Sequence, residues 1–250
     1  LAPPACPASG APVWTLVKDA LLPHCRAAAG HSLVEFPAYQ SADTGSLPGA
    51  ARLVRRRGEL MFDTGIQRPG TMAAILGTTS TPIEEICTRA TKEAGLVVPA
   101  NYNTDEQTVI SGEIAGVERA MELAREAGAK RAIRLPVSGA FHSPLMEPAV
   151  VGLTDAIATS AFTDPNFPVF SNVTADASTT AVNATDIRLR QLTSAVRWST
   201  EIMNIAAHFP AARCVELGPS HDLTGRLPPL AHGARTSACH PAHAADARSP

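Results

Sequence analysis

The residues whose types and spacing most suggest chemistry form the run Gly30-His31-Ser32-Leu33-Val34. This run differs at one residue from the nucleophile elbow G-x-S-x-G, in which a sharp strand-to-helix turn exposes a serine hydroxyl. In such a turn, the backbone N–H after the serine faces the oxyanion that develops during acyl transfer. The run alone leaves two interpretations open, a nucleophilic Ser32 or a serine that caps the following helix.

A serine nucleophile requires a base, and His142 is the best placed of the eight histidines. It lies in the run SGAFHSPLM, residues 138–146, between a predicted strand and a predicted helix, where catalytic groups often lie. His31 is adjacent to Ser32, but neighbouring side chains on a tight turn point apart. On spacing alone, a packed loop histidine stays the simpler interpretation of His142.

Arg55, Arg56 and Arg57 form the basic cluster of the sequence. On a helix these three side chains project in different directions, so at most one faces a given pocket. Their ordinary role is a solvated face. An arginine buried beside a serine nucleophile would instead bind a carboxylate through two hydrogen bonds and select a dicarboxylic acyl group.

Hydrophobic periodicity predicts the elements that must position these residues. In the middle of the chain we expect strands at 71–76, 96–102, 108–111 and 131–137, with helices at 82–94 and 116–127. This β-α-β-β-α-β order is the ferredoxin-like arrangement. On either side we expect helices at 53–61, 145–162, 186–192 and 198–209 and strands at 168–173 and 213–217. Helices that alternate with short apolar strands predict an α/β sheet wound with crossovers.

The amino-acid composition excludes several functional classes of protein. The 250 residues are 45% hydrophobic and 18% charged, as in a packed domain. A net charge of −2 and 4% aromatic residues argue against a nucleic-acid partner. No apolar run is long enough to cross a bilayer. Five widely spaced cysteines without a C-x-x-C pair argue against a disulfide framework or a thiolate zinc site. They favour reduced thiols in a cytoplasmic protein.

The two ends of the chain differ from its middle. Residues 1–12 are rich in proline, and residues 228–250 are rich in Ala, Pro, His and Arg. Such composition offers few large apolar side chains to bury, so both segments are expected to be disordered.

From Gly30 to about Leu227 the sequence resembles the malonyl-CoA–acyl carrier protein transacylases, which load malonyl units for fatty acid and polyketide synthesis. The motifs that carry the resemblance, in the family's order, are GHSL, LVRRRGELM, PGTMAAILG, NYNTDEQTVISG, GAKRAIRLPVSGAFHSPLM, PVFSNVT, RQLTSAVRW and VELGPSHDLTG. The resemblance implies an α/β fold with a hydrolase-like parallel-sheet core over 13–67 and 138–227. A ferredoxin-like subdomain would be inserted at 68–137.

The resemblance also implies a reaction, the transfer of malonyl from malonyl-CoA to the phosphopantetheine thiol of acyl carrier protein. Ser32 matches the nucleophile that carries malonyl as an ester, and His142 matches the general base and acid. Arg57 matches the arginine that pairs with the malonate carboxylate. Gln191 matches the position whose backbone carbonyl orients the histidine. The resemblance implies no metal and no cofactor. Malonyl-CoA takes part in the reaction as a substrate.

Three further residues match positions of the family's site. The N–H of Leu33 would form one half of the oxyanion hole, and Asn103 would line the site. Phe141 would crowd a 2-methyl branch and so select malonyl over methylmalonyl.

Two departures from the family's pattern bear on activity. The family has a G-Q-G loop well upstream of the elbow, whose glutamine supplies the second oxyanion N–H, and no G-Q-G run precedes Gly30. We therefore expect an N-terminally incomplete member. Val34 stands where the elbow has its second glycine, and a β-branched side chain there is expected to strain or open the turn.

Three functions stay open at this point. The chain can be an active malonyl transferase, a catalytically impaired remnant that keeps the fold, or a serine thioesterase or esterase on a related elbow. Arg57 separates the first from the third, since a neutral acyl group has no carboxylate for it to bind.

Overall fold

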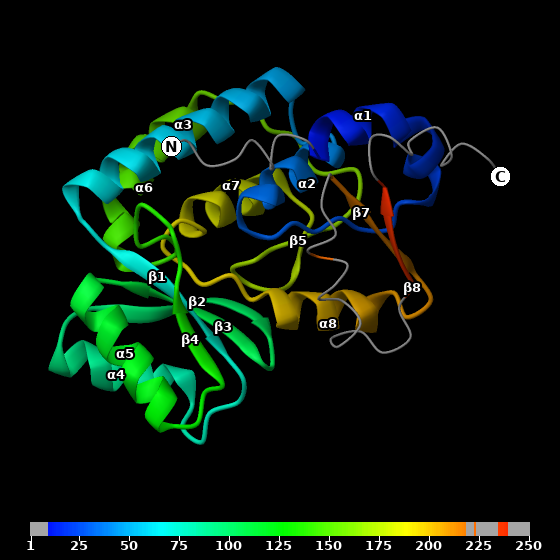
Figure 1. The fold of residues 1–250 in the computed structure, drawn as a ribbon. Helices are drawn as coiled ribbons and strands as arrows, with labels where there is room; N and C mark the ends of the chain where they lie inside the picture. Colours follow the sequence, from blue (N-terminus) through cyan, green and yellow to red (C-terminus); the bar gives the residue numbers. More distant parts are fainter. Residues whose placement is uncertain (1–9, 219–222, 224–234, 240–250) are drawn as a thin grey trace. The chain divides into compact units, whose positions relative to one another are not determined.

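The protein is described by a computed structural model that covers residues 10–218, 223 and 235–239 (Figure 1). The chain divides into two compact units. The first unit falls within residues 1–52, 161–184 and 200–250, and the second within 53–160 and 185–199. Helices combine with β-strands in both units, so the α/β class expected from the sequence is confirmed.

The second unit is built around a four-stranded antiparallel sheet with the strand order β2-β3-β1-β4. Its strands are β1 (Thr71–Leu76), β2 (Val97–Thr104), β3 (Gln107–Gly112) and β4 (Arg131–Arg134). Helices α4 (Ile83–Glu93) and α5 (Ile114–Glu126) lie on one face of this sheet (Figure 1). The unit also contains η4 (Pro144–Met146) and α6 (Glu147–Ala158).

Strand alternation gives this sheet two apolar faces. Ala73, Ile75 and Ile110 belong to the buried cluster formed with α4 and α5. The intervening β1 residues, Met72 and Ala74, belong to a second cluster that includes Ala100 and Val109 and contacts the half-buried Phe141. The sheet is therefore covered on both faces. Helices α4 and α5 pack on one face, and the segment that leads to His142 packs on the other.

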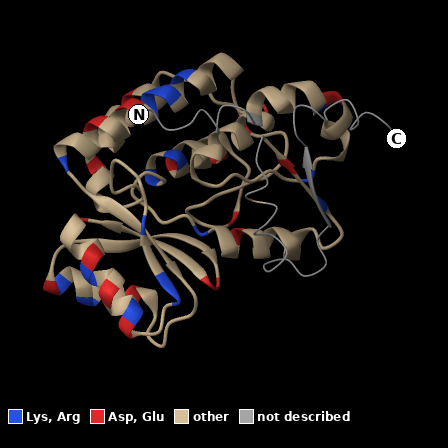
Figure 2. Cartoon of the chain, in the orientation of Figure 1, with Lys and Arg blue, Asp and Glu red and all other residues tan. Residues whose placement is uncertain are grey.

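Helices α4 and α5 carry both acidic and basic residues (Figure 2). Arg119 of α5 donates to Glu93 of α4 at 2.6 Å and to Glu122, one turn further along α5, at 2.8 Å. Charges on one side and apolar residues on the other are the pattern expected of helices that pack on a sheet.

The first unit contains shorter elements. They are α1 (Gly10–Leu21), η2 (Leu22–His24), η3 (Ser32–Val34), α2 (Glu35–Ser41), β5 (Val169–Phe170), β6 (Ala177–Ser178), β7 (Arg213–Leu217) and β8 (Arg235–Cys239). Three helices contain residues of both units, namely α3 (Leu47–Gln67), α7 (Ala181–Arg190) and α8 (Trp198–His208). Tyr39 of α2 and Ala42, directly after this helix, are buried with Phe167 and Val169 and form one core of this unit.

Strand pairing in the first unit is local. β5 pairs antiparallel with β6, and β7 pairs in parallel with β8. Ala28 forms an isolated parallel bridge with Val169, which runs the segment before Ser32 alongside β5. Within the part of the chain that the structure describes, these pairs make no continuous parallel sheet, so the extended parallel core stays a prediction.

The structure differs from the sequence-based expectation at both ends. Residues 10–12, expected to be disordered, begin α1, because Val13, Trp14 and Val17 form a buried stripe at helical spacing. In the tail expected to be disordered, β8 gains backbone hydrogen bonds by pairing with β7. Residues 1–9, 228–234 and 240–250 of these two segments lie outside the described residues.

Two further findings concern the described residues alone. None of their helices combines the length and apolar character needed to span a membrane. Cys25, Cys87 and Cys214 are free thiols, and burial raises the pKa of Cys87 to about 12.

The packing of the sheet on its helices predicts the effect of one core deletion. Ile110 is fully buried, whereas Ile133 on β4 is 44% exposed. Ile110→Ala should lower the free energy of unfolding by about 2–5 kcal/mol, because a cavity remains where the side chain was. Ile133→Ala is the matched control and should cost less than about 1 kcal/mol. Urea unfolding followed by circular dichroism measures both, and equal losses would contradict the assigned core.

Candidate active site

The first unit holds the run that resembles a nucleophile elbow. Ser32 has φ 54°, in the left-handed region that non-glycine residues rarely adopt. The turn is closed by a hydrogen bond from Val34 N–H to the His31 carbonyl at 3.1 Å, and α2 begins directly afterwards at Glu35. A serine held in a strained conformation between an extended segment and a helix is the local geometry of a nucleophile elbow.

Close backbone approach explains why the run begins with glycine. A Cβ atom on Gly30 would lie 2.2 Å from the Val34 carbonyl oxygen and 2.5 Å from the Glu35 nitrogen. Val34 itself has φ −71° and ψ −13°, an ordinary right-handed helical conformation that a β-branched residue adopts. Val34 therefore does not open the turn, contrary to the expectation from the sequence. The close approach lies at Gly30 instead, where a side chain would collide with the backbone of Val34 and Glu35.

The amide of Asn172 holds both sides of this turn. Its Oδ1 accepts from the Ser32 N–H at 2.6 Å, and its Nδ2 donates to the Gly30 carbonyl at 2.8 Å. The same Nδ2 donates to Oε2 of Glu201 at 2.7 Å. Neither residue is among the site residues predicted from the sequence. Each could have been noticed in the sequence. Asn172 lies in the motif PVFSNVT, and Glu201 is a charged residue within the predicted helix 198–209, whose stripe is apolar.

Glu201 is fully buried, and its carboxyl has a perturbed pKa. Burial, followed by the nearby charge of Glu35, raises the pKa of Glu201 well above its usual value, and the hydrogen bond from Asn172 opposes the shift. Burial and the charge of Glu35 both favour the neutral form of this carboxyl.

The second unit holds the candidate base. His142 is 4% exposed and has φ 59°. Its Nδ1 lies 2.9 Å from the Gln191 carbonyl oxygen and 3.2 Å from the Ser194 carbonyl oxygen. Because carbonyl oxygens only accept hydrogen bonds, Nδ1 carries the proton of the neutral ring and Nε2 carries the lone pair. His142 is thus set up to take a proton at Nε2.

The segment that holds His142 is itself attached to the sheet. The Val196 N–H donates to the Ala100 carbonyl, and the Tyr102 N–H donates to the Val196 carbonyl, each at 2.8 Å. These bonds tie Val196 to β2 at a point where the register of that strand shifts. The segment that carries the two carbonyls facing His142 is therefore anchored to the sheet.

Arg57 joins the same cluster through the side chain of Gln191. Its Nη2 donates to Gln191 Oε1 at 3.3 Å, and Arg57 is 4% exposed. Arg55 and Arg56 are exposed and face Glu59 at 3.0 Å and 3.8 Å. One arginine of the three therefore points inward from α3, as the helical spacing predicts. The structure brings Arg57, His142 and Gln191 together within the second unit.

The other predicted site residues lie as follows. Asn103 is buried on β2, and Phe141, directly before His142, is half-buried against the sheet residues Met72 and Ala74. Leu33 follows Ser32 in η3 of the first unit and is half-buried. The roles inferred for these three residues stay predictions.

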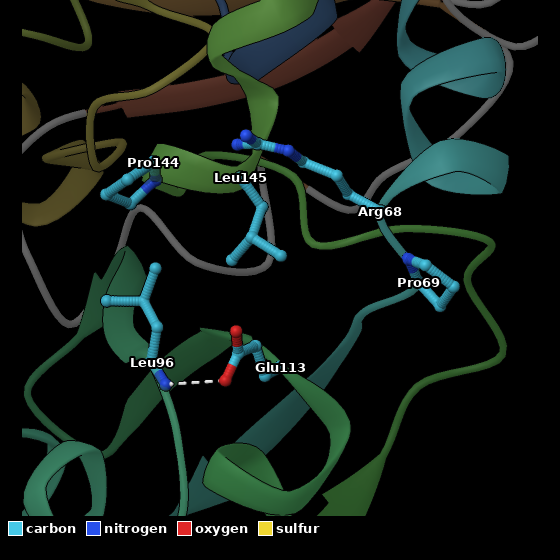
Figure 3. Close-up of a pocket in the computed structure, with 6 residues that line it drawn as sticks. All are labelled: Arg68, Pro69, Leu96, Glu113, Pro144 and Leu145. Carbon is cyan, nitrogen blue, oxygen red and sulfur yellow. Dashed lines mark hydrogen bonds between the residues drawn. The ribbon is translucent and has the colours of Figure 1, made fainter.

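The second unit also has a pocket of about 500 Å³ (Figure 3). Its lining residues are Arg68, Pro69, Leu96, Glu113, Pro144 and Leu145. The Glu113 carboxylate accepts from the Leu96 N–H at 3.1 Å at its floor. None of the predicted site residues lines this pocket.

Comparison with known proteins shows the family. An acyl transferase domain family matches residues 24–225. A malonyl CoA-acyl carrier protein transacylase of Bacillus subtilis is 42% identical over 197 residues, which are 79% of this chain and 62% of the relative. The chain spans about three fifths of the length of the curated relatives that it matches.

Solved structures agree with the sequence matches. An acyl carrier protein S-malonyltransferase from Vibrio cholerae is 34% identical with a TM-score of 0.90, covering 97% of this chain and 79% of that one. A malonyl-transacylase in complex with its type II polyketide synthase acyl-carrier protein is 30% identical with a TM-score of 0.87, covering 96% and 78%. This chain is an acyl transferase domain that belongs to the malonyl-CoA–acyl carrier protein transacylase family. The resemblance found in the motifs is confirmed.

The contact at Gly30 predicts that this position tolerates no side chain. Gly30→Ala should lower the rate at which a fluorophosphonate labels Ser32 by about 100-fold or more, because the new methyl group must displace the Val34 carbonyl. The matched control is Gly58→Ala, which adds a methyl group where no atom lies within 4 Å. Mass spectrometry of the labelled peptide measures both rates, and equal labelling of the two variants would refute the close approach.

Proposed function

We propose that this chain is an acyl-carrier-protein S-malonyltransferase. In this reaction malonyl passes from malonyl-CoA to Ser32 as an ester and then to the phosphopantetheine thiol of acyl carrier protein. The observation that carries the proposal is the direct connection of a base to a carboxylate-binding group, since Gln191 contacts His142 through its carbonyl and Arg57 through its side chain. Membership of the malonyl transacylase family supports the same substrates.

In the proposed first step, His142 takes the proton of the Ser32 hydroxyl at Nε2 while Oγ attacks the malonyl thioester carbonyl. The tetrahedral intermediate collapses, the thiolate of coenzyme A leaves, and His142 returns the proton to it. The second step runs in reverse: the carrier thiol gives its proton to His142, attacks the ester, and Ser32 regains its proton. The mechanism requires a neutral imidazole with its lone pair on Nε2, which the carbonyls of Gln191 and Ser194 favour.

Arg57 supplies the proposed selection for malonyl. Its guanidinium is buried and held by the Gln191 side chain, so its planar set of donors is oriented before substrate binds. Two parallel hydrogen bonds to the terminal carboxylate would distinguish malonyl from acetyl. A thioesterase or esterase that acts on neutral acyl groups has no use for a buried arginine at this position.

The remaining site roles are proposed on position. The Leu33 N–H follows the strained Ser32 and is assigned as one oxyanion donor. Phe141 is packed against the sheet, so its ring would be a rigid barrier to a 2-methyl branch. Asn103, buried on β2, is assigned to the lining of the malonyl site.

The proposal extends to the two parts of the fold that the family resemblance implies. The antiparallel order β2-β3-β1-β4 with α4 and α5 on one face supports a ferredoxin-like subdomain at 68–137. The turn at Ser32 supports a hydrolase-like core for the residues on either side of that subdomain. The proposed partners are malonyl-CoA and acyl carrier protein. The reaction is proposed to need no metal or cofactor, and the cytoplasmic location stays a prediction.

Acylation tests the proposed nucleophile and base. With radiolabelled malonyl-CoA, the wild-type chain should form an ester that a tryptic digest places on Ser32, and Ser32→Ala should form none. His142→Ala should slow acylation by about 10²- to 10⁴-fold, because the proton of Ser32 then has no acceptor. Thermal unfolding of each variant is the control. A label that persists in Ser32→Ala would exclude Ser32 as the nucleophile.

Substrate preference tests the proposed role of Arg57. Arg57→Ala should reduce the preference for malonyl-CoA over acetyl-CoA by about 10- to 100-fold, the effect of losing a hydrogen-bonded charge. Arg55→Ala, which alters an exposed arginine of the same helix, is the matched control and should leave the preference as it was. Acylation rates with both thioesters give the ratio. If Arg57→Ala retains the wild-type ratio, the esterase alternative is favoured.

A further inference from the structure

We propose that Asn172 and Glu201 are positioning residues that hold the Ser32 turn in its strained conformation. Neither touches the reacting atoms in the proposed mechanism. The inference rests on the proposed role of Ser32 as the nucleophile, and it adds two residues to the machinery of that reaction.

Chain pairing brings Asn172 to the turn. The Ala28 N–H donates to the Pro168 carbonyl at 3.0 Å, and the Phe170 N–H donates to the Ala28 carbonyl at 2.9 Å. Because these two segments run parallel, the turns that follow them emerge at the same end. One is the turn at Ser32, and the other is a tight turn over residues 171–176, which the Ala175 N–H closes on the Ser171 carbonyl at 2.7 Å.

The oxygen and both N–H groups of the Asn172 amide form hydrogen bonds. An asparagine side chain has two N–H donors and one carbonyl acceptor. Both donors are engaged, by the Gly30 carbonyl and by Glu201, while Oδ1 accepts from the Ser32 N–H. The two backbone groups that it binds flank His31, so the amide spans the residue before the nucleophile. A rotated amide would set its oxygen against the Gly30 carbonyl and its Nδ2 against the Ser32 N–H. In the observed orientation the second N–H needs an acceptor, which Glu201 provides.

Glu201 meets this need only as a hydrogen-bond acceptor. Its Oε1 is buried and has no hydrogen-bond partner among the described residues, and the charge of Glu35, itself fully buried, acts on it. Burial and this neighbouring carboxyl both raise the pKa of Glu201, which favours its neutral form. The contact itself is the hydrogen bond that Oε2 accepts from Asn172 at 2.7 Å. A glutamine at this position is neutral and keeps an acceptor oxygen.

Helix α8 also contacts the turn over residues 171–176 that carries Asn172. This second contact supplies a matched control. Asn204 lies three residues after Glu201 on the same side of α8, and its Nδ2 donates to the Ala175 carbonyl at 3.0 Å. This bond holds the turn over residues 171–176 but does not reach the amide of Asn172. Removal of Asn204 therefore loosens the turn without releasing the Ser32 N–H.

Four variants of the full chain test the proposal: Asn172→Asp, Glu201→Leu, Glu201→Gln and Asn204→Ala. Ser32 reactivity is measured with a fluorophosphonate and with malonyl-CoA, and thermal unfolding is recorded for each variant. Asn172→Asp should slow both reactions by about 100-fold and Glu201→Leu by about 10-fold, because the turn loses its support. Glu201→Gln should stay within about threefold of wild type, and so should Asn204→Ala.

The kinetic constants separate positioning from a general loss of structure. In the malonyl reaction kcat should fall while KM stays within about twofold, since Arg57 and Gln191 are untouched. The proposal is overturned if Glu201→Gln is as slow as Glu201→Leu, or if Asn204→Ala is as slow as either. It is also overturned if Glu201→Leu reacts at the wild-type rate. Should Asn172→Asp fail to fold, the two Glu201 variants decide.

The two reagents distinguish this inference from the proposed function. If the fluorophosphonate shows the expected order of rates and malonyl-CoA does not acylate the wild-type chain, the positioning inference holds and the malonyl reaction fails. If malonyl-CoA acylates every variant equally, the reaction holds and the positioning inference fails. A wild-type Ser32 that reacts with neither reagent overturns both.

Discussion

The candidate site of the second unit depends on the fully buried Gln191. One residue makes two unlike contacts, a backbone carbonyl to the imidazole of His142 and a side-chain oxygen to the guanidinium of Arg57. The carbonyl is a fixed acceptor that cannot change its protonation state, so it defines the tautomer of the histidine without adding a buried charge. The imidazole of His142 and the guanidinium of Arg57 are thereby oriented by the same short segment, which β2 holds through backbone hydrogen bonds.

Both proposed catalytic residues occupy strained backbone positions. Ser32 and His142 have φ values of 54° and 59°, a conformation that normally costs a non-glycine residue about 1 kcal/mol or more. Such strain persists only where neighbouring groups over-determine the geometry. At Ser32 these groups are the close contact at Gly30 and the amide of Asn172, and at His142 they are the carbonyls of residues 191 and 194. Among the described residues, two of the four non-glycine residues with positive φ are therefore ones that the family resemblance names.

Family and activity rest on different observations. The match over residues 24–225 and the similarity to solved malonyltransferases define the family. The activity of this chain is a proposal, since the chain spans about three fifths of its curated relatives and fold alone does not determine function. What favours it is local chemistry: an imidazole whose Nδ1 faces two carbonyl oxygens, a buried guanidinium and a serine in a closed turn.

Periodicity and motif order were sufficient for the elements of residues 71–134, where β1 coincides with the predicted strand, because alternation and helical spacing are local properties of the sequence. They also singled out Ser32, Arg57, His142 and Gln191. They did not reveal α1, β8 or the absence of strain at Val34, since each depends on packing or pairing with distant residues. The same holds for Asn172 and Glu201. The Asn172 amide spans the Ser32 turn only once segments 140 or more residues apart are brought together by the fold. It meets the buried carboxyl of Glu201 from 29 residues away.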